Sequence, residues 1–342
     1  MIDLRSDTLT HPTQSMRDAM AKAEVGDDVF QEDPTVQKLE ILSAKKMGKE
    51  AGLFVPSGCM GNLISVLSHC GRGDEILLGN RSHISLYEVG GVSALGGVHP
   101  RPLPNNDDGT ISTDLLEKGI RHSDIHCPPT RLICLENTHN FCQGSPLTPE
   151  YMTEVREIAD KFGLKIHLDG ARIFNAAVAL GVPVSKLTEK VDSVMFCLSK
   201  GLSAPVGSLV CGSSDFIHKA RKARKMVGGG MRQAGHIAAA GLIAITELVD
   251  RLQEDHDNAK FLASQLSELD GIEVDITRIK TNIIFFKITG IDGETLVNQL
   301  ENNQIKILMT EVGIFRAVLH RDISKNQVTT VVETFQSILG KQ

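Results

Sequence analysis

The sequence lacks any uninterrupted apolar run that approaches the length of a bilayer span, so we expect no membrane-spanning helix. It also lacks the apolar h-region of a secretory signal, since its N-terminus, MIDLRSDTLTHP, carries charges early. A formal net charge of -6 argues against a general nucleic-acid binder, because phosphate binding needs a basic surface. These absences leave a soluble intracellular protein as the expected class.

CxxC pairs of cysteines are absent as well. The seven cysteines are an odd number, which indicates reduced intracellular thiols rather than a disulfide framework. Hydrophobic residues make up 41% of the chain and charged residues 23%, the ordinary balance of a soluble globular protein. We therefore expect a cytoplasmic protein whose 342 residues form two domains, or one large domain with an appendage.

The middle of the chain alternates between short apolar runs and amphipathic stretches. The expected strands cover residues 52–55, 75–78, 98–103, 131–136, 164–168, 192–198 and 206–211. The expected helices cover residues 63–68, 83–92, 112–119, 150–162, 214–225 and 236–248. This rhythm predicts a largely parallel sheet that is covered by helices on both faces.

The two ends of the chain follow a different pattern. Residues 1–25 are loop-rich apart from a helix at 13–22, and such an arm either packs against a neighbouring element or subunit or is surface coil. The tail predicts helices at 257–269, 293–302 and 325–339 and strands at 271–275, 282–287, 305–309 and 313–319. We expect an N-terminal arm (1–25), a large α/β domain (26–250) and a small C-terminal α+β domain (251–342).

One lysine lies at the end of a predicted buried strand, in the segment VDSVMFCLSKGLSAPVGSLVCG (191–212). The apolar run stops at Ser199-Lys200-Gly201, and a second one follows a turn of small residues. A poorly solvated ammonium group loses its proton more readily and becomes a usable nucleophile. Lys200 could then form a Schiff base with the aldehyde of pyridoxal phosphate (PLP), although a solvated turn lysine gives the same pattern.

Three further groups follow predicted strands, where ligands collect in open α/β sheets. Gly58 and Cys59 begin a helix, whose N–H groups and dipole suit a phosphate, although an ordinary helix cap looks the same. Asp169 ends a buried strand and needs a cationic partner, either the pyridinium nitrogen of PLP or Arg172. His83 begins a helix, where its imidazole could stack on a flat cofactor ring, move a proton, or face solvent.

Together these groups are the parts of a fold-type I PLP enzyme, in the chain order of the aspartate aminotransferase superfamily. The sequence also resembles the threonine aldolases, which cleave L-threonine or L-allo-threonine, from Leu4 to at least Ala317. The matching segments are LRSDT, EVGDDVFQEDPTV, SGCMGN, LENTHN, HLDGARIFNA, SVMFCLSKGLSAPVGS and RKMVGGGMRQAG. The resemblance implies an α/β fold of type I, with a large, mostly parallel seven-stranded sheet domain and a small C-terminal α+β domain.

The resemblance also implies how PLP would be held. Lys200 would carry it as a Schiff base, Asp169 would face the pyridine nitrogen, and His83 would stack on the ring. The phosphate would lie at Gly58 and Cys59. The family usually has threonine in place of this cysteine, and a thiol is the poorer hydrogen-bond partner, so the backbone contact is the expected one.

Other matched residues would serve the substrate or the assembly. Ser6, Arg172 and Arg316 would hold the substrate carboxylate, which suits the bidentate grip of a guanidinium, and Arg172 would also border the cofactor. Arg232 would reach the phosphate from a second subunit. That role implies a homo-oligomer with a shared active site, commonly a tetramer.

Three matched positions carry looser roles. Tyr87 and His126 would lie near the substrate hydroxyl and influence the preference between the two diastereomers. Lys225 would occupy a further active-site position. His126 also has a simple alternative as a loop residue, because Cys127-Pro128-Pro129 follows it.

The implied reaction is retro-aldol cleavage of L-threonine or L-allo-threonine to glycine and acetaldehyde, a step in threonine catabolism and glycine biosynthesis. The base would be His83, His126 or an ordered water, and no metal ligand set is assigned. Two alternatives stay open. One is another PLP reaction, such as serine hydroxymethyl transfer, racemisation or β-elimination, and the other is a non-catalytic homologue.

Overall fold

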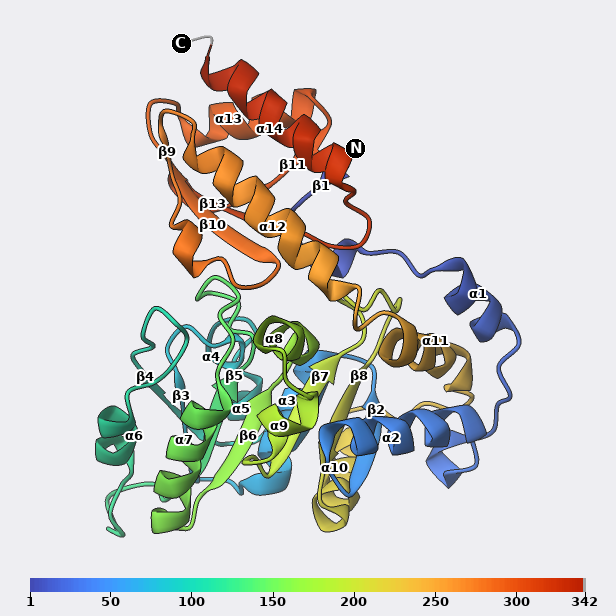
Figure 1. Cartoon of the computed structure of the whole chain (residues 1–342). Coiled ribbons are helices and arrows are strands. Elements are labelled where there is room, and N and C mark those ends of the chain that lie inside the picture. The colour runs from blue at the N-terminus through green and yellow to red at the C-terminus, as the bar shows by residue number, and fades with distance from the viewer. Residues whose placement is uncertain (341–342) are drawn as a thin grey trace.

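The computed structural model describes residues 1–340, which form a larger and a smaller lobe (Figure 1). The larger lobe holds a seven-stranded sheet in the order β2-β8-β7-β6-β5-β3-β4. Its strands are β2 (Ala51–Val55), β3 (Glu75–Gly79), β4 (His99–Leu103), β5 (Thr130–Glu136), β6 (Lys165–Asp169), β7 (Ser193–Cys197) and β8 (Ser208–Gly212). Every residue of β3, β7 and β8 is buried, as the continuous apolar runs predict for strands covered on both faces.

Most neighbouring strands of this sheet are parallel, and only β8 runs against its two neighbours. The register pairs Glu136 with Asp169 and Asp169 with Met195. The carboxyl ends of β5, β6 and β7 therefore meet at one edge of the sheet. This confirms the predicted α/β class with a mostly parallel sheet.

Helices cover both faces of the sheet (Figure 1). They are α1 (Gln14–Ala21), α2 (Pro34–Met47), α3 (Gly58–His69), α4 (His83–Leu86), α5 (Gly91–Ala94), α6 (Thr113–Gly119), α7 (Pro149–Phe162), α8 (Ile173–Leu180), α9 (Val184–Thr188), α10 (Ser214–Met226) and α11 (Gly235–Glu247). The single helix expected at 83–92 is wrong. Val89 and Gly90 adopt left-handed φ angles of 55° and 63°, which separate α4 from α5.

The smaller lobe contains a four-stranded antiparallel sheet in the order β12-β13-β10-β9. Its elements are α12 (Leu252–Ser267), β9 (Ile272–Glu273), β10 (Ile283–Ile288), α13 (Gly293–Asn302), β11 (Ile305–Lys306), β12 (Leu308–Glu311), β13 (Ile314–Val318) and α14 (Lys325–Leu339). The expected strand at 305–309 is divided between β11, which leaves this sheet, and β12. None of the helices in residues 1–340 is long and apolar enough to cross a membrane.

The N-terminal arm joins the smaller lobe. Strand β1 (Ile2–Asp3) pairs in parallel with β11, and Ile2 and Leu4 pack into the hydrophobic core of that lobe. The chain then passes over the larger lobe, where α1 packs against α11. The alternative that the arm is surface coil is therefore wrong, whereas domain boundaries at residues 25 and 250 stay predictions.

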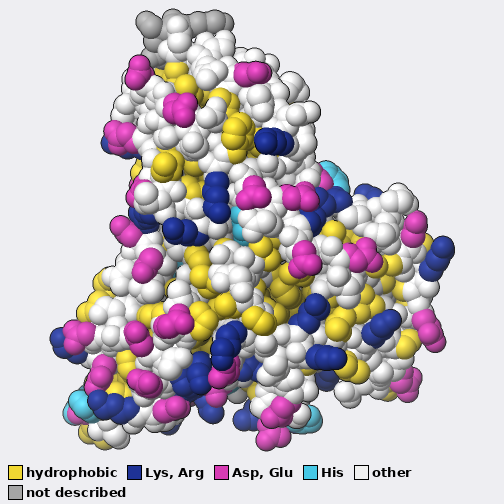
Figure 2. Space-filling view, viewed as in Figure 1, with side chains coloured by type: hydrophobic (Ala, Val, Ile, Leu, Met, Phe, Trp, Pro, Cys, Tyr) yellow, Lys and Arg dark blue, Asp and Glu magenta, His cyan; other side chains and the backbone are white. Residues whose placement is uncertain are grey.

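Figure 2 shows the same side of the molecule with charged side chains of both signs scattered over the two lobes. Hydrophobic side chains gather over α8 and α11 on the larger lobe. Several α11 residues there are only partly buried, namely Ile237, Leu242 and Ile243. This face of the larger lobe therefore carries apolar area that the rest of the chain leaves partly accessible.

Candidate active site

A cavity of about 150 Å³ lies where β5, β6 and β7 end. Side chains from distant parts of the chain line it, among them Lys200, Asp169, His83, Gly58 and Cys59. The aligned strand ends explain this meeting, because Asp169 ends β6 and Lys200 follows β7 by three residues. The structure thus brings together five of the residues that the sequence predicts for PLP, and Arg172, a sixth, lines the same cavity.

Asp169 is 2% exposed and is held by two hydrogen bonds. Its Oδ1 accepts from the Ala171 amide (3.0 Å), and its Oδ2 accepts from Asn62 Nδ2 (2.8 Å). The alternative prediction, that Arg172 pairs with Asp169, is wrong, because the Arg172 guanidinium pairs with Asp7 instead. Within residues 1–340, no cationic side chain forms an ion pair with Asp169. A buried carboxylate in this state favours a cationic ligand group.

The corner of the cavity that is predicted to bind the phosphate lies at the start of α3. Ser57 caps this helix through the Met60 amide, and Gly58 is its first residue. A Cβ at Gly58 would lie 2.9 Å from Cys197 Sγ, so the close approach of the backbone there requires glycine. Partial burial and the nearby Glu88 carboxylate raise the pKa of the Cys59 thiol to about 11.

A hydrogen-bonded network surrounds His83, and sequence reasoning missed it. Asn62 donates to Glu88 Oε1 (2.7 Å) as well as to Asp169, while its Oδ1 faces His167 Nε2 at 3.1 Å. Glu88 Oε1 also lies 2.9 Å from His83 Nδ1. Burial opposes the imidazolium, but the Glu88 hydrogen bond and Asp169 outweigh it and raise the pKa of His83. Asn62 thus ties the strand-end carboxylate to the histidine.

A second cavity, of about 480 Å³, adjoins the first and reaches the smaller lobe. Lys200, His83 and Arg172 line both cavities, and Ser6, Tyr87 and Arg316 line this one. Tyr87 stacks on Phe141, with ring centroids 5.3 Å apart. This cavity therefore combines polar groups with an aromatic wall beside the lysine.

Two guanidinium groups converge in the second cavity. Arg172 Nη1 and Arg316 Nη1 both donate to Asn140 Oδ1, at 3.3 and 3.2 Å. Arg316 also donates to the Arg5 carbonyl, but it forms no ion pair within residues 1–340. Burial and the neighbouring Arg172 lower the pKa of Arg316 to about 10. An incoming carboxylate would relieve this charge imbalance.

Asp7 holds Arg172 in place. Its two oxygens accept from Arg172 Nε (2.7 Å) and Nη2 (2.8 Å), and both residues are buried. Burial alone would raise the pKa of Asp7, but the guanidinium lowers it far below its usual value. Nη1 takes no part in this pair and donates to Asn140 Oδ1 in the second cavity instead, so this end of the guanidinium is the one offered to a ligand.

The family model for beta-eliminating lyases matches residues 3–289. The chain is 49% identical over 344 residues to low-specificity L-threonine aldolase 1 of Arabidopsis thaliana, covering 99% of this chain and 96% of that protein. It is 44% identical to the low specificity L-threonine aldolase of Escherichia coli K12, with both chains covered completely. The chain belongs to the threonine aldolase family.

The structure of Leishmania major threonine aldolase agrees in fold with this family member. It superimposes with a TM-score of 0.84 at 18% identity, covering 99% of this chain and 100% of the other. The structure of a Sphingomonas wittichii serine palmitoyltransferase superimposes with a TM-score of 0.77, and the match covers 98% of this chain and 86% of the palmitoyltransferase chain. These neighbours confirm the fold-type I architecture predicted from the sequence.

Three residues matched to the aldolase active site lie outside both cavities of their own chain. His126 is in the loop before β5, where its side chain is 82% exposed and pairs with Asp124. Arg232 is exposed and pairs with Asp27. Lys225 lies at the end of α10. Their roles in catalysis or binding therefore stay predictions.

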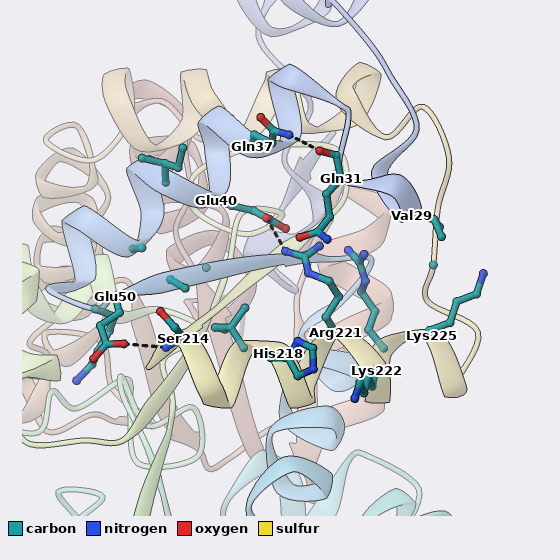
Figure 3. A pocket seen from close by; sticks show the side chains of 18 of the residues that line it. Val29, Gln31, Gln37, Glu40, Glu50, Ser214, His218, Arg221, Lys222 and Lys225 are labelled. Carbon is teal, nitrogen blue, oxygen red and sulfur yellow. Dashed lines mark hydrogen bonds and ion pairs between the residues drawn. The ribbon is translucent and has the colours of Figure 1, made fainter.

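Lys225 instead borders a groove of about 950 Å³ between α2 and α10. Figure 3 shows Arg221, Lys222 and Lys225 on one side of this groove, and Arg221 pairs with Glu40 across it. The groove is separate from the two cavities around Lys200, because it shares no lining residue with them.

Proposed function

We propose that this protein cleaves L-threonine and L-allo-threonine to glycine and acetaldehyde with PLP, as a lyase. The observation that carries the proposal is the shared cavity of Lys200 and Asp169, with the guanidinium pair of Arg172 and Arg316 directly beside it. Threonine aldolases that align over the whole chain at 44% and 49% identity support the choice of substrate.

The residues of the cavity fit PLP. Asp169 is a buried carboxylate without a cationic partner in the described structure, Gly58 opens a helix N-terminus, and Lys200 supplies the amine. We propose that these residues meet the ring nitrogen, the phosphate and the aldehyde, with His83 against the ring face. Bound PLP would withdraw electrons from the substrate and so allow its Cα–Cβ bond to break.

The remaining residues would orient the substrate and move its proton. Arg316, with Arg172 and Ser6, would hold the carboxylate and so fix which bond to Cα is cleaved. With the Nδ1 proton donated to Glu88 Oε1, which lies 2.9 Å away, Nε2 would be free to take the β-hydroxyl proton directly or through a water. Tyr87 would border the substrate's β-substituent.

The product assay decides between the reactions open to this scaffold. Purified protein with PLP is given each threonine diastereomer without folate, and acetaldehyde is followed by its reduction with alcohol dehydrogenase and NADH. We expect acetaldehyde and glycine in equal amounts. An α-keto acid and ammonia would instead show β-elimination, which the name of the matched family model makes the second candidate. No product, and no visible absorbance with PLP, would indicate a non-catalytic homologue.

We further propose that the active site is shared within a homo-oligomer, and that this oligomer is a tetramer. Arg232 and Lys225 lie outside the cavity that holds Lys200 in the same chain. Partly buried hydrophobic residues gather over α11 (Figure 2). A partner that covers this side would bring Arg232 to its neighbour's phosphate. His126 would reach the substrate through movement of its loop or from a neighbour.

Mixing two inactive variants tests this sharing. Lys200→Ala and Arg232→Ala each damage a different part of the site, so mixed oligomers would contain some sites with neither change. We expect activity to return to about a quarter of wild type for random pairing. No recovery between variants that exchange subunits would place both residues in one chain.

The cellular setting follows from the chemistry of the chain. All seven cysteines are free, as expected in a reducing compartment, and we propose the cytoplasm. The proposed reaction would serve threonine catabolism and glycine formation there.

A further inference from the structure

Two residues that line the cofactor cavity, Cys59 and His83, form a cluster with Glu88 that has the composition of a metal site. Cys59, His83 and Glu88 each place one potential ligand atom so that all three atoms lie within 4.8 Å of one another. A thiolate, an imidazole and a carboxylate are the ligand types that Zn²⁺ accepts in a tetrahedral site with one open position. We propose that the cofactor-free protein binds one Zn²⁺ ion at these three residues, and that this ion competes with PLP.

An unpartnered oxygen supports the cluster independently. The Glu88 side chain is 4% exposed, and its Oε2 has no hydrogen-bond partner within residues 1–340. Its Oε1 is held by Asn62 (2.7 Å) and lies 2.9 Å from His83 Nδ1. A cation would satisfy the orphaned oxygen, and the Asn62 contact would keep the carboxylate in place as an outer-shell partner.

Carboxylates outnumber free cationic groups around this cavity. The buried carboxylates of Glu136 and Asp169 face it together with the Lys200 amine, whereas Arg172 is already neutralised by Asp7. With a neutral imidazole, the Cys59 thiolate and the Glu88 carboxylate carry two negative charges, which balance one Zn²⁺ ion. Binding would release the thiol proton to solvent and involves no electron transfer.

The ion can enter and has room for a water ligand. Cys59 is exposed and His83 keeps 32% of its side chain accessible, so two of the ligands can be reached from solvent. Both line the cavity that holds Lys200 and Asp169. Zn²⁺ at this position would occupy the space needed by the PLP ring and its phosphate, so the two ligands exclude each other.

Cobalt is the probe for this site, because Co²⁺ replaces Zn²⁺ and a thiolate ligand gives it a charge-transfer band in the near ultraviolet. Full-length protein is freed of PLP with hydroxylamine and titrated with Co²⁺ and then with Zn²⁺. We expect one ion per chain, a charge-transfer band that Zn²⁺ abolishes, and at least about 10-fold weaker binding in Cys59→Ser and Glu88→Gln. Only Cys59→Ser should lose the band.

Cys127→Ser is the matched control, since Cys127 is half-buried and lies outside the cavity. It should bind Co²⁺ as wild type does, and protein preloaded with PLP should bind none at this site. The proposal is overturned if wild type shows no band, if Cys59→Ser keeps it, or if PLP that has bound, as its visible absorbance shows, leaves cobalt binding unchanged. A protein that binds cobalt but never PLP would refute the proposed function and leave the metal site standing.

Discussion

Asn62 offers a test of how the site is built, because one amide connects two carboxylates and a buried histidine. The change Asn62→Leu keeps the branched shape of the side chain and removes the hydrogen bonds to Asp169 (2.8 Å), Glu88 (2.7 Å) and His167 (3.1 Å). Bonds to charged acceptors contribute about 1.5–3 kcal/mol each and the neutral one about 0.5–1.5 kcal/mol. The buried leucine offsets about 2 kcal/mol of this loss.

We therefore expect Asn62→Leu to lower the free energy of unfolding by about 2–5 kcal/mol and the urea midpoint by roughly 1 M. Asp169 would keep only its bond to the Ala171 amide, so PLP should bind about 10-fold more weakly. Urea unfolding followed by circular dichroism measures the first effect, and PLP titration followed by absorbance measures the second.

Thr188→Val is the matched control for this experiment. Thr188 is fully buried in α9 and donates to the Met47 carbonyl (2.7 Å), outside the cofactor cavity. The Thr188→Val variant should have a free energy of unfolding about 1 kcal/mol lower than wild type and should bind PLP with unchanged affinity. The reasoning about Asn62 is refuted if both variants bind PLP equally well, or if Asn62→Leu is as stable as wild type.

Three further predictions concern charge. Arg316→Lys should raise the KM for threonine about 10-fold or more, because an ammonium cannot grip a carboxylate at two points, and steady-state kinetics with an unchanged KM would contradict this. Asp7→Asn should lower the free energy of unfolding by about 3–5 kcal/mol, since it leaves Arg172 buried without its partner; unchanged urea unfolding would contradict this. Burial lowers the pKa of His167 to about 3 and of His256 to about 4, so the folded protein resists protonation that the unfolded chain accepts near pH 6.5. The contribution of these histidines to the free energy of unfolding is thus fully present above pH 6.5. It should fall towards pH 4 by up to about 1.4 kcal/mol per pH unit for each histidine. A urea midpoint that stays constant between pH 6.5 and pH 4 would contradict this.

The strand ends of the site could be predicted from sequence because a buried parallel strand has a simple signature. The apolar runs before Asp169 and Lys200 correctly predicted β6 and β7. A parallel sheet brings such ends together, whatever lies between them in the chain. His83 and Gly58 were found in the same way, at the starts of helices that follow strands.

Contacts across the fold could not be predicted, since no local pattern specifies them. The pairing of Asp7 with Arg172 joins residues 165 positions apart, and the sequence suggested Asp169 as the partner. Asn62 lies inside α3, where it looks like an ordinary helix residue. Glu88 reaches His83 from the turn that follows α4, just before Val89 takes a left-handed conformation that a β-branched residue rarely adopts.

The central claim is that Lys200 carries the cofactor, and borohydride reduction tests it most directly. Protein loaded with PLP is reduced, digested and mapped by mass spectrometry. The account predicts a pyridoxyl group on the peptide that contains Lys200 and loss of the visible absorbance. Label on another lysine, or no stable label after reduction, would contradict it.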